Sequence, residues 1–187
     1  RVFSASSAEL VERAFGEEVA RRLQVQPHSM GYFREVLTGP VAFPRDRLRI
    51  GIVGHISMHK GSRLVRRLAD ARRRRALDIS FTVIGTLDSA PVADVAVTGS
   101  YLTKELPDLL ERHSINLVLV PSICPETFCF VAHETIALGL PLAVLDLGAQ
   151  AEAAASYTRG LVIRDDDPDR LLDACMEFAA SGFCRQS

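Results

Sequence analysis

Between residues 49 and 180 the sequence alternates short, wholly apolar segments with longer segments whose apolar residues recur at helical spacing. Strands that are apolar throughout must be covered on both faces, and their alternation with helices is typical of a parallel sheet. Because crossovers between parallel strands are right-handed, this pattern predicts a doubly wound α/β fold. The expected strands are 49–53, 79–84, 94–97, 116–120, 142–145 and 161–163, and the expected helices are 61–76, 102–113, 128–138, 149–157 and 168–180.

The first part of the chain follows a different pattern. Residues 4–23 predict one helix, whereas residues 25–47 contain several prolines and glycines and keep no period, which favours a connector with a short strand at 23–27. We therefore divide the chain into residues 1–44, a connector region, and residues 45–187, the α/β domain. Because the chain begins with arginine rather than methionine, we expect it to be a piece of a longer protein.

Composition narrows the class of partner. The net charge of -1 gives no general attraction to nucleic acid, and the basic run at residues 72–75 is expected to be a solvated helix end. No apolar run approaches the ~20 residues of a membrane span, so any membrane contact is expected to be peripheral. The four cysteines form no C-x-x-C pair, which favours reduced cytoplasmic thiols over a zinc site.

Ligands of a doubly wound sheet bind outside the carboxyl ends of the strands, where helices begin. The first such loop runs from Gly54 to Gly61 and carries Lys60 beside the expected helix start. Glycines let a ligand approach the backbone, and free N–H groups beside a lysine suit a phosphate. The loop lacks the P-loop pattern, so the residues also allow an ordinary turn with a solvated lysine.

A second loop follows the strand at 116–120 and carries Glu126, with Glu134 about two turns along the next helix. A carboxylate on an otherwise apolar helix is costly to bury unless it finds donors, and vicinal sugar hydroxyls are such donors. The spacing by itself also allows a structural Glu134 that pairs with an arginine.

Taken together, these loops resemble the motifs of a known family. The segment ETFCFVAHE, from Glu126 to Glu134, resembles the E-x7-E motif of the group 1 glycosyltransferases, also called glycosyltransferase family 4. Upstream, GIVGHISMHKG resembles the G-R-x-x-x-x-K-G loop of that family, and VTGSYLTKELPDLLERH resembles the start of another of its helices. The resemblance covers residues 48–166 in the same order and spacing.

The resemblance implies a GT-B fold, in which two Rossmann-like domains face each other across a cleft. This chain is similar to the C-terminal, donor-binding domain, and residues 2–23 are then the end of the acceptor-side domain. The implied reaction transfers a sugar from a nucleotide-diphosphate sugar, with retention, to a saccharide or lipid-linked acceptor held by the other domain. No metal or other cofactor is implied, and the chain alone is expected to be inactive.

The resemblance also assigns roles to single residues. Lys60 and Glu126 are the implied catalytic residues, with Lys60 at the diphosphate and Glu126 at the donor sugar, and Glu134 is implied to hold the ribose hydroxyls. The amides of residues 127–129 are implied to meet the sugar or the distal phosphate. The other implied donor-binding residues are Gly54, His55, Gly61, Gly85, Tyr101, Thr127, Phe128 and Cys129. Of these, Gly85 and Tyr101 fall where the family lines its base pocket.

The sequence departs from the family pattern in two places. His55 stands where the family usually has arginine, and Thr127 and Cys129 stand where small residues are common. Two other interpretations therefore stay open. One is a GT-B sugar-nucleotide epimerase, against which the E-x7-E motif argues. The other is a non-catalytic nucleotide-binding or scaffold domain, which the loss of the arginine at His55 allows.

Overall fold

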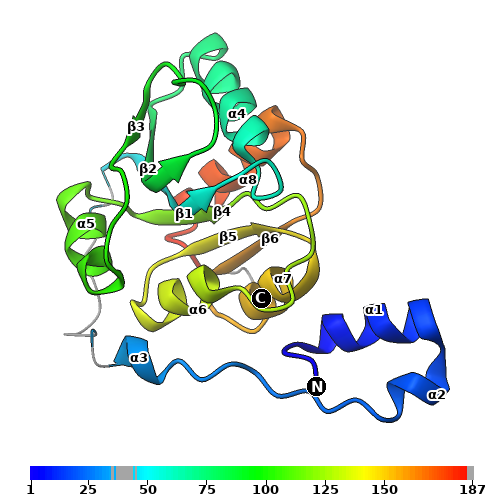
Figure 1. Ribbon diagram of the computed structural model, residues 1–187. Coiled ribbons are helices and arrows are strands. Elements are labelled where there is room, and N and C mark those ends of the chain that lie inside the picture. Colours follow the sequence, from blue (N-terminus) through cyan, green and yellow to red (C-terminus); the bar gives the residue numbers. More distant parts are fainter. Residues whose placement is uncertain (35, 37–43, 45, 185–187) are drawn as a thin grey trace.

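Six strands form one all-parallel sheet in the order β3-β2-β1-β4-β5-β6 (Figure 1), which confirms the predicted doubly wound fold. The computed structural model describes residues 1–34, 36, 44 and 46–184. The strands are β1 Leu48–Ile56, β2 Ile79–Leu87, β3 Val95–Val97, β4 Leu117–Val120, β5 Leu142–Leu145 and β6 Gly160–Ile163. The helices are α1 Ala5–Phe15, α2 Glu17–Ala20, α3 Gly31–Arg34, α4 Ser62–Arg74, α5 Leu106–Arg112, α6 Phe130–Ala137, α7 Gly148–Ala155 and α8 Pro168–Ala180, with a 3-10 turn, η1 Thr103–Glu105, before α5.

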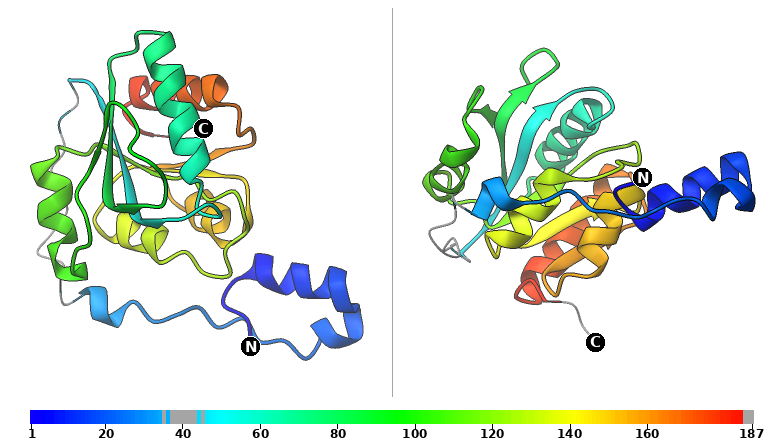
Figure 2. Two further views of the ribbon diagram at one scale, coloured as in Figure 1. Left: turned by 45° about the horizontal axis from the view of Figure 1, so that its top comes forward. Right: turned by 60° about the horizontal axis from the view of Figure 1, so that its bottom comes forward.

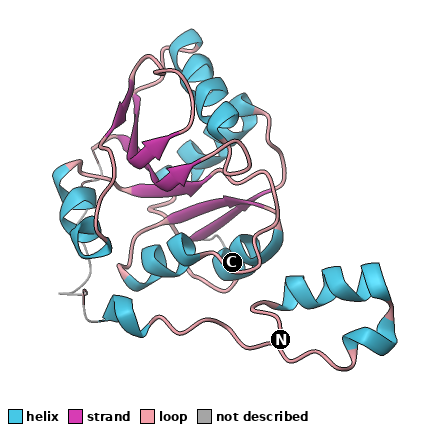
Figure 3. Ribbon diagram, viewed as in Figure 1, coloured by secondary structure: helices cyan, strands magenta, loops and turns pink. Residues whose placement is uncertain are grey.

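Successive strand residues point to opposite sides of the sheet, so both sides carry apolar side chains that need cover. Helices cover both faces (Figure 3). In β4, Leu117 and Leu119 pack in one core with α4 and α8, whereas Val118 and Val120 pack in the other core with α5, α6 and α7. All four side chains are buried. The continuous apolar runs in the sequence are therefore strands buried on both faces, as the alternation of strands and helices predicts.

The two longest strands extend beyond their predicted ends. β1 and β2 pair over nine residues, from Leu48 opposite Ile79 to Ile56 opposite Leu87. Ladder hydrogen bonds join backbone groups, so the pairing continues past the apolar segments through polar positions. This extension carries the polar residues His55 and Thr86 to the carboxyl end of the sheet.

The N-terminal prediction of one helix over residues 4–23 is wrong. Gly16 has a φ of 85°, a left-handed value that ends α1 and separates it from the short helix α2. The strand expected at 23–27 is reduced to one isolated bridge between Val25 and Val2. The predicted boundary between residues 44 and 45 and most of the second half of the connector lie outside the described residues, so they stay predictions.

The N-terminal segment projects beyond the α/β domain (Figures 1 and 2) but is tied to it at the start of α1. The carboxylate of Glu152, on α7, accepts hydrogen bonds from the backbone N–H groups of Ala5 and Ser6 at 3.3 and 3.1 Å. A carboxylate at a helix N-terminus is favoured by the helix dipole.

Among the described residues, none of the helices has the length and apolarity of a membrane span.

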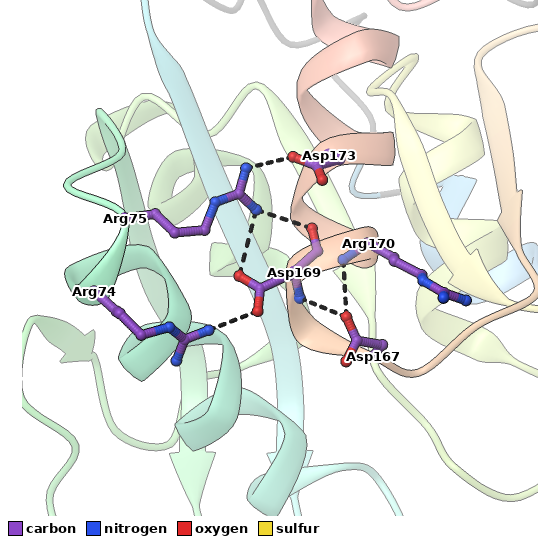
Figure 4. Close-up of polar contacts among 6 residues, drawn as sticks. All are labelled: Arg74, Arg75, Asp167, Asp169, Arg170 and Asp173. Carbon is purple, nitrogen blue, oxygen red and sulfur yellow. Dashed lines mark hydrogen bonds and ion pairs between the residues drawn. The ribbon is translucent and has the colours of Figure 1, made fainter.

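Ion pairs join α4 to α8 on one face of the molecule (Figure 4). Arg74 bonds Asp169 at 2.6 Å, and Arg75 contacts both Asp169 and Asp173. Asp167 accepts from the backbone N–H groups of residues 169 and 170, so it caps α8. The basic run at 72–75 lies at the partly solvated end of α4, as predicted, and it also pairs with acidic side chains.

Asn116 fixes the place where the connector joins the sheet. Its side chain is 1% exposed, and its Oδ1 accepts from the backbone N–H of Arg49 at 2.7 Å. Its Nδ2 donates to the carbonyl oxygens of Pro44 and Arg47 at 2.8 and 2.6 Å. One buried amide thus satisfies three backbone groups where the connector enters β1.

We expect Asn116→Ala to lower the free energy of unfolding by about 2–4 kcal/mol, because it leaves buried donors and acceptors without partners. Urea denaturation measures this loss. Asp46→Ala is the control, since it removes an exposed partner of the same Arg49, and its denaturation midpoint should move little. Equal losses in the two variants would contradict the role of Asn116.

Candidate functional site

Two charged side chains meet where the chain changes direction across the sheet. β1 is followed by β2 on one side, and its other neighbour, β4, is followed by β5 on the far side. The loops after β1 and β4 therefore diverge and leave a crevice, which is where ligands of such sheets bind. Lys60, after β1, lies with its Nζ 3.8 Å from Oε1 of Glu126, after β4. The side chain of Lys60 is 47% exposed and that of Glu126 is 18% exposed.

The backbone beside Lys60 leaves no room for a larger residue. Gly61 has a φ of 88°, and a Cβ there would lie 2.1 Å from the carbonyl oxygen of Pro121. The loops after β1 and β4 are therefore in direct backbone contact. The hydrogen bond from the N–H of Ile123 to the carbonyl of His59, at 3.1 Å, joins them a second time.

Two side chains and a close backbone contact position Glu126. The hydroxyl of Ser122 donates to its Oε1 at 2.5 Å. Gln150, which is fully buried on α7, accepts from the N–H of Glu126 and donates to the carbonyl of Cys124, both at 3.0 Å. Gly148 packs against the same backbone, since a Cβ there would lie 2.8 Å from the nitrogen of Glu126. The loop that carries Glu126 is thus held before any ligand binds.

The backbone N–H groups of residues 127–129 donate to no acceptor in the part of the chain that the structure describes. They precede α6, whose N-terminus adds a partial positive charge. The side chains of Phe128 and Cys129 are buried, whereas Thr127 is exposed. Phe128 is 8% exposed and stacks on His133, and burial, with a smaller contribution from the charge of Glu126, raises the pKa of the Cys129 thiol to about 12. The backbone, rather than the cysteine, is therefore what this segment offers to an anion.

A cavity of about 290 Å³ lies at the carboxyl ends of β1 and β2. Gly54 and Gly85 are opposite each other in the ladder, and a Cβ on Gly85 would lie 2.1 Å from the carbonyl oxygen of Gly54. A ring nitrogen of His55 lies 2.7 Å from the hydroxyl of Thr86. Burial raises the pKa of the Tyr101 phenol to about 12. The cavity is lined by Gly54, His55, Gly85, Thr86, Ser100, Tyr101 and Thr103.

Glu134 is buried, with 7% of its surface exposed. Among the described side chains, its partner is a tyrosine rather than the arginine of the alternative interpretation: the hydroxyl of Tyr32, on α3, donates to Oε1 at 2.8 Å. Burial raises the pKa of the Glu134 carboxyl, and the hydrogen bond from Tyr32 opposes this shift. Tyr101 is near enough for the charge of Glu134 to add to the rise in its own pKa. Glu134 is thus a carboxylate beside the cavity whose charged form is destabilised by burial.

The structure brings the predicted residues into two groups. One joins Lys60, Gly61 and Glu126 around the crevice, and the other joins the cavity at the ends of β1 and β2 with Glu134 near Tyr101. His55 lines the cavity and lies next to Thr86. Sequence reasoning missed four residues that shape the site: Tyr32, Thr86, Ser122 and Gln150. The contacts of Tyr32, Thr86 and Gln150 join segments distant in sequence, whereas Ser122 lies in the same loop as Glu126.

A parallel sheet with a charged crevice at its switch point defines a class of nucleotide-binding α/β domains. Comparison with known proteins is more specific. The family model described as "Glycosyl transferases group 1" matches residues 47–181. The chain therefore belongs to the group 1 glycosyltransferases, as the motifs predict. No curated protein sequence gives a significant match.

Solved structures share the fold. The chain superposes on sucrose-phosphate synthase from Thermosynechococcus elongatus with a TM-score of 0.72 and 19% identity, covering 98% of this chain and 50% of that one. The lipopolysaccharide outer core galactosyltransferase WaaB in its apo form gives a TM-score of 0.70 at 16% identity, covering 98% of this chain and 53% of that one. Anabaena HepE in complex with UDP-glucose gives a TM-score of 0.69 at 16% identity, covering 97% of this chain and 54% of that one. The chain thus spans about half the length of these relatives, and its fold is confirmed as one half of a GT-B fold.

We expect Glu134→Gln to become progressively more stable than the wild type as the pH rises above about 4.5, the ordinary pKa of this carboxyl. A pKa raised by folding means that the carboxyl contributes stability below its unfolded pKa and loses it as the pH rises through the folded pKa. Glutamine does not titrate and keeps an acceptor for Tyr32. Urea denaturation between pH 4 and 7 measures the difference, and parallel curves for the two proteins would contradict it.

Proposed function

We propose that this chain is the donor-binding half of a retaining glycosyltransferase. The whole protein then transfers a sugar from a nucleotide-diphosphate sugar to a saccharide or lipid-linked acceptor. The observation that carries the proposal is the Lys60–Glu126 pair in the switch-point crevice, 3.8 Å apart and flanked by unoccupied backbone N–H groups. The group 1 family and the UDP-glucose bound by HepE support it.

The diphosphate is the leaving group, and negative charge grows on it as the bond to the sugar breaks. Lys60 supplies a positive charge that is half exposed and so reaches a ligand in the crevice. The N–H groups of residues 127–129 and the start of α6 supply fixed dipoles beside it. Groups that are already oriented stabilise the developing charge without a cost of reorganisation at the moment of reaction. This arrangement requires no metal ion.

Glu126 is placed to act on the sugar. Ser122 and Lys60 both approach its Oε1, so the carboxylate is oriented and its charge is balanced before the donor arrives. In the proposed complex it accepts hydrogen bonds from sugar hydroxyls and stabilises positive charge on the ring. The acceptor approaches from the other half of the protein, so we expect this chain alone to bind donor without transferring the sugar.

The cavity at the ends of β1 and β2 is placed to take the base. Its glycines let the base lie against the backbone, and Tyr101 offers an aromatic wall. The charge of Glu134 contributes to the raised pKa of Tyr101. Glu134 is then the group that binds the ribose, which lies between the base and the diphosphate. The two groups of residues thus correspond to the two ends of one nucleoside diphosphate.

We expect Lys60→Ala to weaken the binding of a nucleoside diphosphate by roughly 1.5–3 kcal/mol at low salt, and to change nucleoside binding little, because only the diphosphate meets the lysine charge. Added salt should reduce the difference, since Lys60 is half exposed. Calorimetric titration with UDP, GDP, ADP and the corresponding nucleosides measures both effects. Lys104→Ala, which changes the only other lysine, is the control. Equal losses for nucleoside and diphosphate would remove Lys60 from the phosphate site.

We expect Glu134→Gln to weaken the binding of a ribonucleoside diphosphate roughly 10- to 150-fold, because charge-assisted hydrogen bonds to the ribose become neutral. The wild type should bind the 2′-deoxy form more weakly than the ribo form, and the variant should largely lose this preference. Glu177→Gln, at an exposed position on α8, should leave both affinities unchanged. If Glu134→Gln still discriminates ribose from deoxyribose as the wild type does, Glu134 is not the ribose ligand.

A further inference from the structure

The two carboxylate oxygens of Glu134 have different surroundings. Oε1 accepts the hydrogen bond from Tyr32 at 2.8 Å. Oε2 accepts no hydrogen bond from the residues that the structure describes, yet no fully buried polar side-chain atom among them lacks a partner. Oε2 therefore keeps some contact with solvent. Oε2 is thus open to a donor, whereas the phenol takes one of the two lone pairs of Oε1.

The described residues make few contacts with Tyr32 other than at its hydroxyl. The next residue, Phe33, is 1% exposed and anchors α3 in the core that contains α5, α6 and α7. Tyr32 is 42% exposed. The centroid of its ring lies 6.1 Å from that of Phe33 and 6.3 Å from that of Phe130. The side chain can therefore rotate into solvent, while Phe33 keeps α3 in place.

A ribose offers two vicinal hydroxyls, and a carboxylate that binds both uses both oxygens. The first hydroxyl can bond Oε2 as the structure stands. The second meets the tyrosine hydroxyl at Oε1, and the burial of Glu134, which is 7% exposed, leaves little room for both donors. The net gain from the second hydroxyl is then reduced, because the hydrogen bond from Tyr32 is broken as the new one forms.

We propose that Tyr32 competes with a ribose hydroxyl for Oε1 of Glu134 and so determines how strongly the site prefers ribose to deoxyribose. This inference rests on the proposed function, since it needs a ribose at Glu134. It assigns to the segment before the α/β domain a part in donor recognition: α3 carries a side chain that must leave the carboxylate before the ribose is fully bound.

The test removes the hydroxyl alone. Tyr32→Phe should bind the ribonucleoside diphosphate about tenfold more tightly, the change expected when a hydrogen bond to a charged group need not be broken first. It should bind the 2′-deoxy form with little change, so the ratio of the two affinities rises. Tyr32→Ala, which also removes the ring, should raise the ratio in the same direction. The probe is whichever of UDP, GDP or ADP the chain binds most tightly, each paired with its 2′-deoxy form.

Two further proteins separate this role from a structural one. Tyr157→Phe removes a phenol at the end of α7, far along the chain from the site, and should leave both affinities and their ratio unchanged. The double variant Tyr32→Phe with Glu134→Gln should show no gain over Glu134→Gln alone, because the competition requires the carboxylate. Melting temperatures without ligand confirm that each variant is folded.

The outcomes distinguish the two proposals. If the wild type binds a ribonucleoside diphosphate and Tyr32→Phe binds it equally or more weakly, the competition is overturned and the proposed function stands; weaker binding would make Tyr32 a residue that orients Glu134. If neither the wild type nor any Tyr32 variant binds one, the proposed function fails and the competition fails with it.

Discussion

The burial of β1 on both faces is the constraint on which the rest of the structure depends. Its apolar residues contribute to both cores, and its edges pair with β2 and β4. A strand in that position cannot leave the sheet without exposing both cores, so its carboxyl end is a fixed point. The loop with Lys60 starts from that end, and the loop with Glu126 starts from the neighbouring end of β4. Helices α4 and α6 then lie on opposite faces, which opens the crevice between them.

The site combines a closely packed backbone with the charges of Lys60 and Glu126, which have few other partners among the described residues. Gly61 against Pro121 and Gly148 against Glu126 allow no side chain at the contacts, so the loop positions follow from close packing of the main chain. Gln150 bonds the backbone of the loop after β4, which leaves the Glu126 side chain to Ser122 and Lys60. The basic run of α4, by contrast, is matched by acidic residues such as Asp169 and Asp173. Lys60 has Glu126 as its ion-pair partner, and its side chain stays half exposed at the crevice.

Much of the fold could be predicted because its signals are local. The helix cap at Asp167 with Pro168 and the apolar segments of β4 and β5 were located within a few residues, since capping and burial on both faces leave direct marks in the sequence. The break at Gly16 was missed because the apolar spacing continues across it, and a glycine within a periodic segment can be part of a helix. The added length of β1 and β2 was missed because ladder pairing does not depend on apolar side chains.

The sequence by itself determined the order of strands and helices and the family, because these depend on periodicity or on motifs of neighbouring residues. It also located Lys60 and Glu126 in the loops after β1 and β4, and Glu134 on the helix that follows the second loop. Only the tertiary structure decided their partners. Tyr32 is 102 residues from Glu134 in sequence, and Gln150 is 24 residues from Glu126. Such pairs carry no periodic signal, since a hydrogen bond between distant segments requires only that folding bring one donor to one acceptor.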